Sequence, residues 1–122
     1  MARILLIDDE PLVRRTLQLA LENAGHSVAT AEDGEGGIAL ARTLGFDLVV
    51  TDVLMPGRDG LDTIMDMRRE RPAMRILAIS GAGHSARVDF LKLARGLGAT
   101  RTLEKPFLSG TLIATVADCL AA

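Results

Sequence analysis

The chain is organised around one segment, Asp47-Leu-Val-Val-Thr-Asp-Val-Leu-Met-Pro-Gly-Arg-Asp-Gly60. Its apolar run at residues 48–50 is short and rich in valine, which is typical of a strand buried on both faces of a parallel sheet. The run leads to Asp52, and Pro56 and Gly60 then turn the chain. Open α/β sheets bind ligands at the carboxyl ends of their strands, so Asp52 is a candidate site residue. The segment alone leaves open that Asp52 starts a turn or caps the next helix.

Four further short runs surround this segment, and they predict strands at residues 4–7, 27–30, 75–80 and 100–103. Between the runs, apolar residues recur at helical spacing. Gly25, Gly45, Gly96 and Gly98 are expected to close helices, and Ser109 is expected to cap the last one. Strict alternation of strands and helices predicts an α/β fold with a parallel sheet covered by helices on both faces. A chain of 122 residues is expected to form one domain, residues 1–122.

Composition excludes several functions. The net charge is −2, and acidic and basic residues are interspersed, so no basic stripe supports direct nucleic-acid binding. No apolar run approaches the length of a membrane span, and charge appears too early for a signal peptide, which predicts a cytoplasmic protein without membrane contact. Cys119 is the only cysteine, and its place in an apolar helical pattern predicts a packing role.

Polar residues gather at the predicted strand ends. Asp8 and Asp9 follow the first strand, Asp52 ends the third, Ser80 ends the fourth, and Lys105 follows the fifth. Parallel strands end at the same edge, so these side chains are expected to converge. Three carboxylates in one cleft require a bound cation or a retained proton, and oxygen ligands without histidine or cysteine favour Mg²⁺. A phosphoryl site follows, with Ser80 and Lys105 holding phosphoryl oxygens and Asp52 as the nucleophile.

Each of these residues also has a simpler interpretation. Asp8 and Asp9 could be a charge pair at a helix N-terminus, Ser80 a turn residue and Lys105 a solvated cation. Five such coincidences at one sheet edge are improbable, so the sequence favours a site.

From end to end the chain resembles a response-regulator receiver domain of two-component signalling, of the single-domain, chemotaxis-regulator type. The resemblance lies in Ile4-Leu-Leu-Ile-Asp-Asp-Glu10, Asp52-Val-Leu-Met-Pro-Gly57, Asp59-Gly-Leu61, Ser80-Gly81, Gly98-Ala99 and Lys105-Pro-Phe107. It implies a flavodoxin-like (βα)5 three-layer sandwich, with a five-stranded parallel sheet of order 2-1-3-4-5.

The resemblance also implies a function. Asp52 would accept a phosphoryl group from a phosphohistidine of a histidine kinase or a histidine phosphotransfer protein, and the change would alter contacts with an output protein. Asp9, Asp52 and the backbone carbonyl of Leu54 would bind Mg²⁺, with Asp8 acting through water. The domain would catalyse only its own phosphorylation and dephosphorylation, and would not be an enzyme in the usual sense.

The resemblance assigns the remaining site residues as well. Ser80 and Lys105 would contact the phosphoryl group, and the bond between Lys105 and Pro106 would be cis. One position departs from the family pattern, because Thr102 stands where the family usually has an aromatic residue that moves inward together with the hydroxyl residue. Ser80 and Thr102 are therefore the expected switch positions, but coupling through an aromatic ring is not available. We expect phosphorylation to act on the loops after Asp52 and Ser80 instead.

Two other functions compete with this one. An aspartyl phosphatase would need a second carboxylate two residues after the nucleophile, and that residue is Leu54. A degenerate receiver, acting as a binding module independent of phosphorylation, would be expected to lack the acceptor, the acidic pair or the lysine. All of these are present, which favours the phosphorylation switch.

Overall fold

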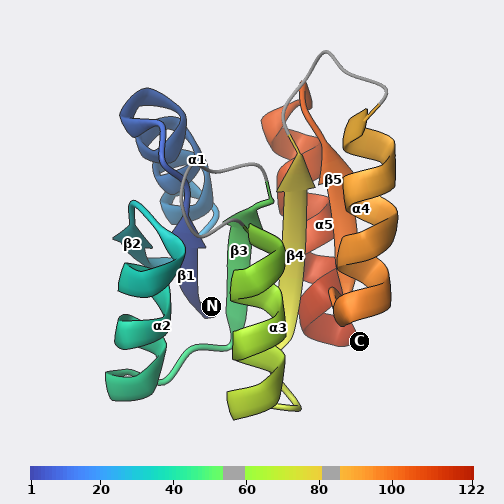
Figure 1. The fold of residues 1–122 in the computed structure, drawn as a ribbon. Coiled ribbons are helices and arrows are strands. Elements are labelled where there is room, and N and C mark those ends of the chain that lie inside the picture. Colours follow the sequence, from blue (N-terminus) through green and yellow to red (C-terminus); the bar gives the residue numbers. More distant parts are fainter. Residues whose placement is uncertain (54–59, 81–85) are drawn as a thin grey trace.

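Strands and helices alternate strictly along the computed structural model, which describes residues 1–53, 60–80 and 86–122, and of residues 86–91 only the backbone (Figure 1). The strands are β1 (Arg3–Ile7), β2 (Ser27–Ala31), β3 (Leu48–Asp52), β4 (Arg75–Ser80) and β5 (Arg101–Glu104). The helices are α1 (Pro11–Asn23), α2 (Gly34–Thr43), α3 (Gly60–Glu70), α4 (Ala86–Leu97) and α5 (Ser109–Ala121). None of the described helices combines the length and apolar composition that a bilayer span needs.

The five strands form one parallel sheet in the order β2-β1-β3-β4-β5, which confirms the expected flavodoxin-like topology. β3 lies in the middle of the sheet and is buried at all five positions. Its register with β4 pairs Asp52 with Ile79, so Ser80 lies one residue beyond the end of β3. The central position of β3 places Asp52 between the ends of β1 and β4.

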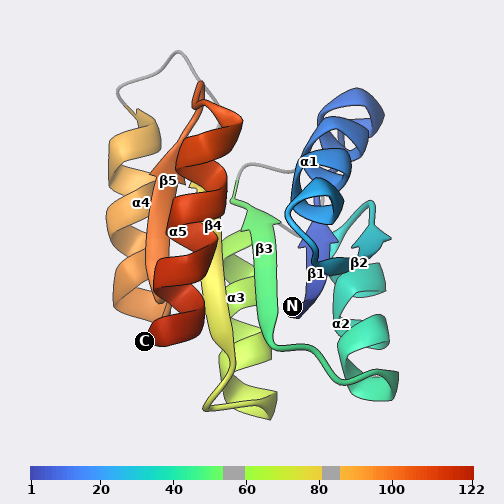
Figure 2. The ribbon, with the colours of Figure 1, turned by 180° about the vertical axis from the view of Figure 1, so that it is seen from behind.

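Two hydrophobic cores, one on each face, hold the helices against the sheet. Helices α2, α3 and α4 cover one face, and α1 and α5 cover the other (Figures 1 and 2). Side chains alternate between the faces, as strand geometry requires. In β1, Leu5 and Ile7 pack towards α2 and α3, whereas Ile4 and Leu6 pack towards α1 and α5. The near-continuous apolar runs of the strands are explained by this burial on both faces.

The structure confirms several of the expected element ends. β1 begins one residue earlier than expected, β2 and β5 end one residue later, and three further expectations are corrected. Gly25 and Gly98 have positive φ angles of 97° and 122° and follow α1 and α4, as expected of closing glycines. Gly96 was expected to close a helix too, but it lies within α4. Ser109 is the first residue of α5 rather than its cap. Leu108 holds the N-cap position, and its apolar side chain has no atom that could accept a capping hydrogen bond.

The third correction concerns β5, which begins at Arg101 instead of Thr100. Thr100 still pairs with β4, through one backbone bond and one bond to its side chain. The N–H of Thr100 donates to the Ile76 carbonyl at 2.7 Å, and the N–H of Ile76 donates to Thr100 Oγ1 at 3.1 Å. A hydroxyl thus takes the place of the backbone acceptor, and the regular ladder starts one residue later.

Three arginines hold helix C-termini at the end of the molecule opposite the carboxyl ends of the strands. Arg71 Nη2 donates to the Ala41 carbonyl in α2 at 2.8 Å, and Arg75 Nη2 donates to the Ala122 carbonyl after α5 at 3.0 Å. Arg68, in α3, donates to the carbonyl of Gly98 directly after α4. Cations at helix C-termini stabilise carbonyls that have no helical partner and complement the helix dipole.

Cys119 is fully buried in the core beneath α5, which confirms its packing role. Burial raises the pKa of its thiol from 9.0 to about 11. We therefore predict that the native thiol resists alkylating reagents at pH 8 and reacts once the protein is unfolded in urea.

The raised pKa of the Cys119 thiol also predicts how stability depends on pH. Between pH 9 and pH 11 the unfolded state loses its thiol proton first, so the free energy of unfolding falls by at most about 2–3 kcal/mol. Urea denaturation of the wild type and of Cys119→Ala across this range measures the effect, which should be absent from the variant. Equal slopes in both proteins would contradict the prediction.

Candidate functional site

The polar side chains expected at the strand ends do meet at one edge of the sheet. Asp8 follows β1 and Asp52 ends β3, and both are nearly inaccessible to solvent, with exposures of 1% and 4%. Ser80 ends β4 and is fully buried. Lys105 follows β5, and its N–H donates to the Ser80 carbonyl at 2.9 Å. This backbone bond places Lys105 beside the ends of the more central strands.

Lys105 joins two of the carboxylates. Its Nζ donates to Asp52 Oδ2 at 3.0 Å and to Asp8 Oδ2 at 3.3 Å, and its side chain is 16% exposed. Burial lowers the pKa of Lys105, but the charges and hydrogen bonds of Asp52 and Asp8 outweigh this and raise it above its ordinary value. The lysine is therefore charged at neutral pH and compensates part of the buried negative charge.

A second group of acids fits a hard divalent cation. Carboxylate oxygens of Asp8, Asp9 and Glu10 all lie within 4.8 Å of one another, while exposure increases from the buried Asp8 to the exposed Glu10. Three carboxylates without histidine or cysteine are the donor set that Mg²⁺ accepts. The predicted ligands Asp8 and Asp9 therefore fit the ion. Glu10 was missed by sequence reasoning, although it continues the acidic run directly after Asp9.

Ser80 carries a polar atom without a partner. Its Oγ is buried and makes no hydrogen bond to any described residue. Buried hydroxyls are nearly always hydrogen-bonded, and an exception needs an explanation. A ligand with oxygen acceptors, bound at the end of β4, would provide the missing partner, in agreement with the role predicted for Ser80.

Gly60 brings the start of α3 into direct contact with the end of β3. Its N–H donates to the Val53 carbonyl at 3.2 Å. A Cβ atom at Gly60 would lie 2.1 Å from the carbonyl oxygen of Asp52 and 2.3 Å from Cα of Val53. Only glycine permits this approach of two backbones, so the absent side chain fixes where α3 begins relative to Asp52.

Three other predicted residues have different outcomes. The bond between Lys105 and Pro106 is cis, as predicted. Thr102 is half-buried, and because its neighbour Leu103 packs on the face of α1 and α5, Thr102 belongs to the face of α4. Leu54, whose carbonyl was predicted to bind the metal, lies outside the described residues, so this ligand remains a prediction.

Comparison with known proteins agrees with this architecture. The sequence pattern of the response regulator receiver domain matches residues 4–117. Protein PilH of Pseudomonas aeruginosa is similar at 35% identity over 121 residues, which cover 99% of this chain and 99% of PilH. The alginate biosynthesis transcriptional regulatory protein AlgB of the same species is 40% identical over 104 residues. These residues are 85% of this chain but only 22% of AlgB, so the chain spans about a fifth of that relative.

Solved structures give the same result. The receiver domain of NtrX from Brucella abortus superposes with a TM-score of 0.91 at 29% identity, covering 98% of both chains. Both the order of the strands and the sequence pattern thus agree with one family. The chain belongs to the response regulator receiver domain family.

Proposed function

We propose that this chain accepts a phosphoryl group on Asp52 from a phosphohistidine of a histidine kinase or phosphotransfer protein, in a reaction that requires Mg²⁺. The observation that carries this proposal is that Lys105 Nζ bonds to both Asp52 and Asp8, whose side chains are nearly inaccessible to solvent. Such a lysine provides a cation at the position where phosphoryl charge would arrive. Residues 1–122 act in this proposal as one cytoplasmic receiver domain whose output is a change in protein contacts.

Each residue of the site has a separate role in the phosphoryl transfer. An oxygen of Asp52 forms a bond to phosphorus while the bond from phosphorus to the histidine nitrogen breaks, and the imidazole leaves with the electron pair. Lys105 and the hydroxyl of Ser80 hold phosphoryl oxygens. Asp8 and Asp9, with Asp52, would hold Mg²⁺, which when bound neutralises the charge that develops on the phosphoryl group.

Phosphorylation by a small-molecule phosphodonor tests the proposal. Wild-type protein, incubated with the donor and Mg²⁺, is expected to gain one phosphoryl adduct in intact-mass spectra, and Asp52→Asn is expected to gain none. Asp118→Asn is the matched control, because Asp118 is an exposed aspartate on α5. Chelation of Mg²⁺ should abolish the adduct in every sample.

The same experiment addresses the competing functions. An adduct that persists in Asp52→Asn would place the acceptor elsewhere. Absence of an adduct from folded wild type would favour a binding module independent of phosphorylation. Continuous release of phosphate from the donor, at a rate far above the decay of the isolated adduct, would favour a phosphatase.

A further inference from the structure

Asp8 is fixed by contacts from four directions. Its N–H donates to the Ala31 carbonyl at 3.2 Å, and its Oδ1 accepts the N–H of Glu10 at 3.0 Å. Its Oδ2 accepts from Lys105 Nζ, and its carbonyl oxygen accepts from Arg14 Nη1 at 2.8 Å. The first three contacts belong to the sheet and to the site already described. The contact from Arg14 belongs to neither.

Arg14 reaches Asp8 because of its place in α1. Its own N–H donates to the Glu10 carbonyl at 2.9 Å, so it lies one helical turn after the acidic run. Side chains of a helix point towards its N-terminus, which directs the guanidinium back onto the turn that carries Asp8 and Asp9. The side chain of Glu10, the N-cap residue of α1, makes no capping hydrogen bond. Arg14 therefore provides a second side-chain anchor for this turn, by donating to a backbone carbonyl rather than accepting from a backbone N–H.

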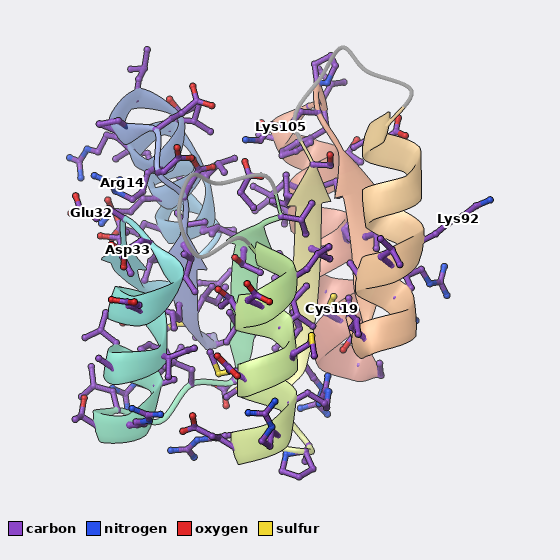
Figure 3. All side chains as sticks on the ribbon, in the orientation of Figure 1. Arg14, Glu32, Asp33, Lys92, Lys105 and Cys119 are labelled. Atoms are coloured by element: carbon purple, nitrogen blue, oxygen red, sulfur yellow. The ribbon has the colours of Figure 1, made fainter. Side chains whose placement is uncertain are left out.

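Arg14 is also a cation beside a candidate cation site. It lines a groove of about 520 Å³ together with Glu32, at the end of the sheet that carries Lys105 (Figure 3). Its field opposes the binding of Mg²⁺, whereas its hydrogen bond keeps the carboxylates in place. These two effects have opposite signs, so a measurement of Mg²⁺ affinity separates them.

We propose that Arg14 is a positioning residue for the metal site: it fixes the peptide of Asp8, and through it the direction in which Asp9 presents its carboxylate. The proposal rests on the proposed function, because it concerns the same Mg²⁺ site. Partners that orient metal ligands from outside the coordination sphere commonly change affinity by about tenfold or more. Fixing the turn thus outweighs the repulsion of a partly solvated, screened charge.

The test is the affinity of the protein for Mg²⁺ alone, measured by titration of amide chemical shifts without any phosphodonor. Arg14→Ala is expected to raise the dissociation constant about tenfold. Arg15→Ala is the matched control, since Arg15 is the adjacent arginine, is exposed and donates a hydrogen bond to the Gln18 side chain rather than to the turn that carries Asp8. It should leave the constant within about twofold of wild type, because screening weakens an exposed charge. Arg14→Lys should recover most of the loss, because an ammonium can donate to the same carbonyl.

Three results would overturn this proposal and leave the proposed function intact. Tighter Mg²⁺ binding by Arg14→Ala would mean that Arg14 acts only through the repulsion of its charge. Unchanged binding would mean that its hydrogen bond to the Asp8 carbonyl does not affect the metal site. An equal loss in Arg14→Ala and Arg14→Lys would also exclude the hydrogen bond as the cause. Failure of the wild type to bind Mg²⁺ would overturn the proposed function together with this inference, and is thereby distinguishable from a failure of the inference alone.

Two further measurements, of stability and of the Mg²⁺ concentration needed for phosphorylation, distinguish a positioning role of Arg14 from a purely structural one. Urea denaturation in the presence of a chelator measures the stability of the metal-free proteins. In phosphorylation assays, Arg14→Ala should need more Mg²⁺ for half-maximal rate while reaching nearly the wild-type rate at saturation. A variant that is only less stable would show neither this change in Mg²⁺ requirement nor a weaker Mg²⁺ affinity of the folded protein.

Discussion

Replacement of Lys105 by methionine is expected to lower the free energy of unfolding by about 3–5 kcal/mol at neutral pH in the absence of metal. Methionine keeps much of the volume but removes the ammonium group between Asp52 and Asp8, whose side chains are only 4% and 2% exposed. Breaking a buried ion pair by removing one partner leaves charge without compensation, and this costs more than the pair contributed.

Urea denaturation with a chelator measures the loss, and two further variants identify its cause. Lys92→Met removes the other lysine of the chain, which is exposed on α4, and should change stability by less than about 0.5 kcal/mol (Figure 3). In an Asp52→Asn background, Lys105→Met should lower the free energy of unfolding much less, because one of the two carboxylates has already been replaced by a neutral amide. Mg²⁺ should restore part of the stability of Lys105→Met by binding the folded state. Wild-type stability in Lys105→Met would contradict the expectation.

Replacement of Gly60 by alanine is expected to destabilise the protein by about 3 kcal/mol and to slow phosphorylation of Asp52 strongly. The added methyl group would meet the Asp52 carbonyl oxygen at 2.1 Å, and atoms of the backbone cannot rotate away as a flexible side chain can. The end of β3 or the start of α3 must move, and either change displaces the acceptor from Lys105.

Gly96→Ala is the matched control for this substitution. Gly96 is also a helical glycine, but nothing lies within 4 Å of the position that its Cβ would occupy. Alanine there should raise stability by about 0.5–1 kcal/mol through the higher helix propensity of alanine. The two substitutions add the same methyl group and are expected to act in opposite directions. A Gly60→Ala protein with wild-type stability and phosphorylation would show that the contact is not restrictive.

The sequence predicts the sheet well because burial on both faces leaves a strong local signal. The run at residues 76–79 is apolar throughout, and the alternation of such runs with helices allows few topologies. Convergence of Asp8, Asp52 and Lys105 follows from the common edge of parallel strands, without knowledge of side-chain positions. Features that depend on a single side-chain contact were less accessible, as the start of β5 at the Thr100 hydroxyl illustrates.

The same distinction, between features set by the sequence pattern and features set by a single side-chain contact, applies to the site. Residue types at strand ends indicate which groups are near one another, but not which of them bond. Arg14 was not predicted, because its role depends on the direction of one side chain across a turn of α1. Glu10 belongs to the family pattern, but the pattern gives it no role, and only the structure shows its carboxylate within 4.8 Å of those of Asp8 and Asp9. The partner of the Ser80 hydroxyl is a ligand in our proposal, and no protein sequence encodes a ligand directly.

The arginines at the far end of the molecule have a consequence for movement. Arg71, Arg75 and Arg68 hold the C-terminal ends of α2, α5 and α4, whereas the N-terminal ends of these helices lie towards the site. A helix held at one end behaves as a lever, and its displacement grows with distance from the pivot. The 12 residues of α4 span about 18 Å, so a tilt of about 10° moves the free end by about 3 Å while the held end stays in register. The fold thus confines the largest rearrangements to the end that carries Asp52.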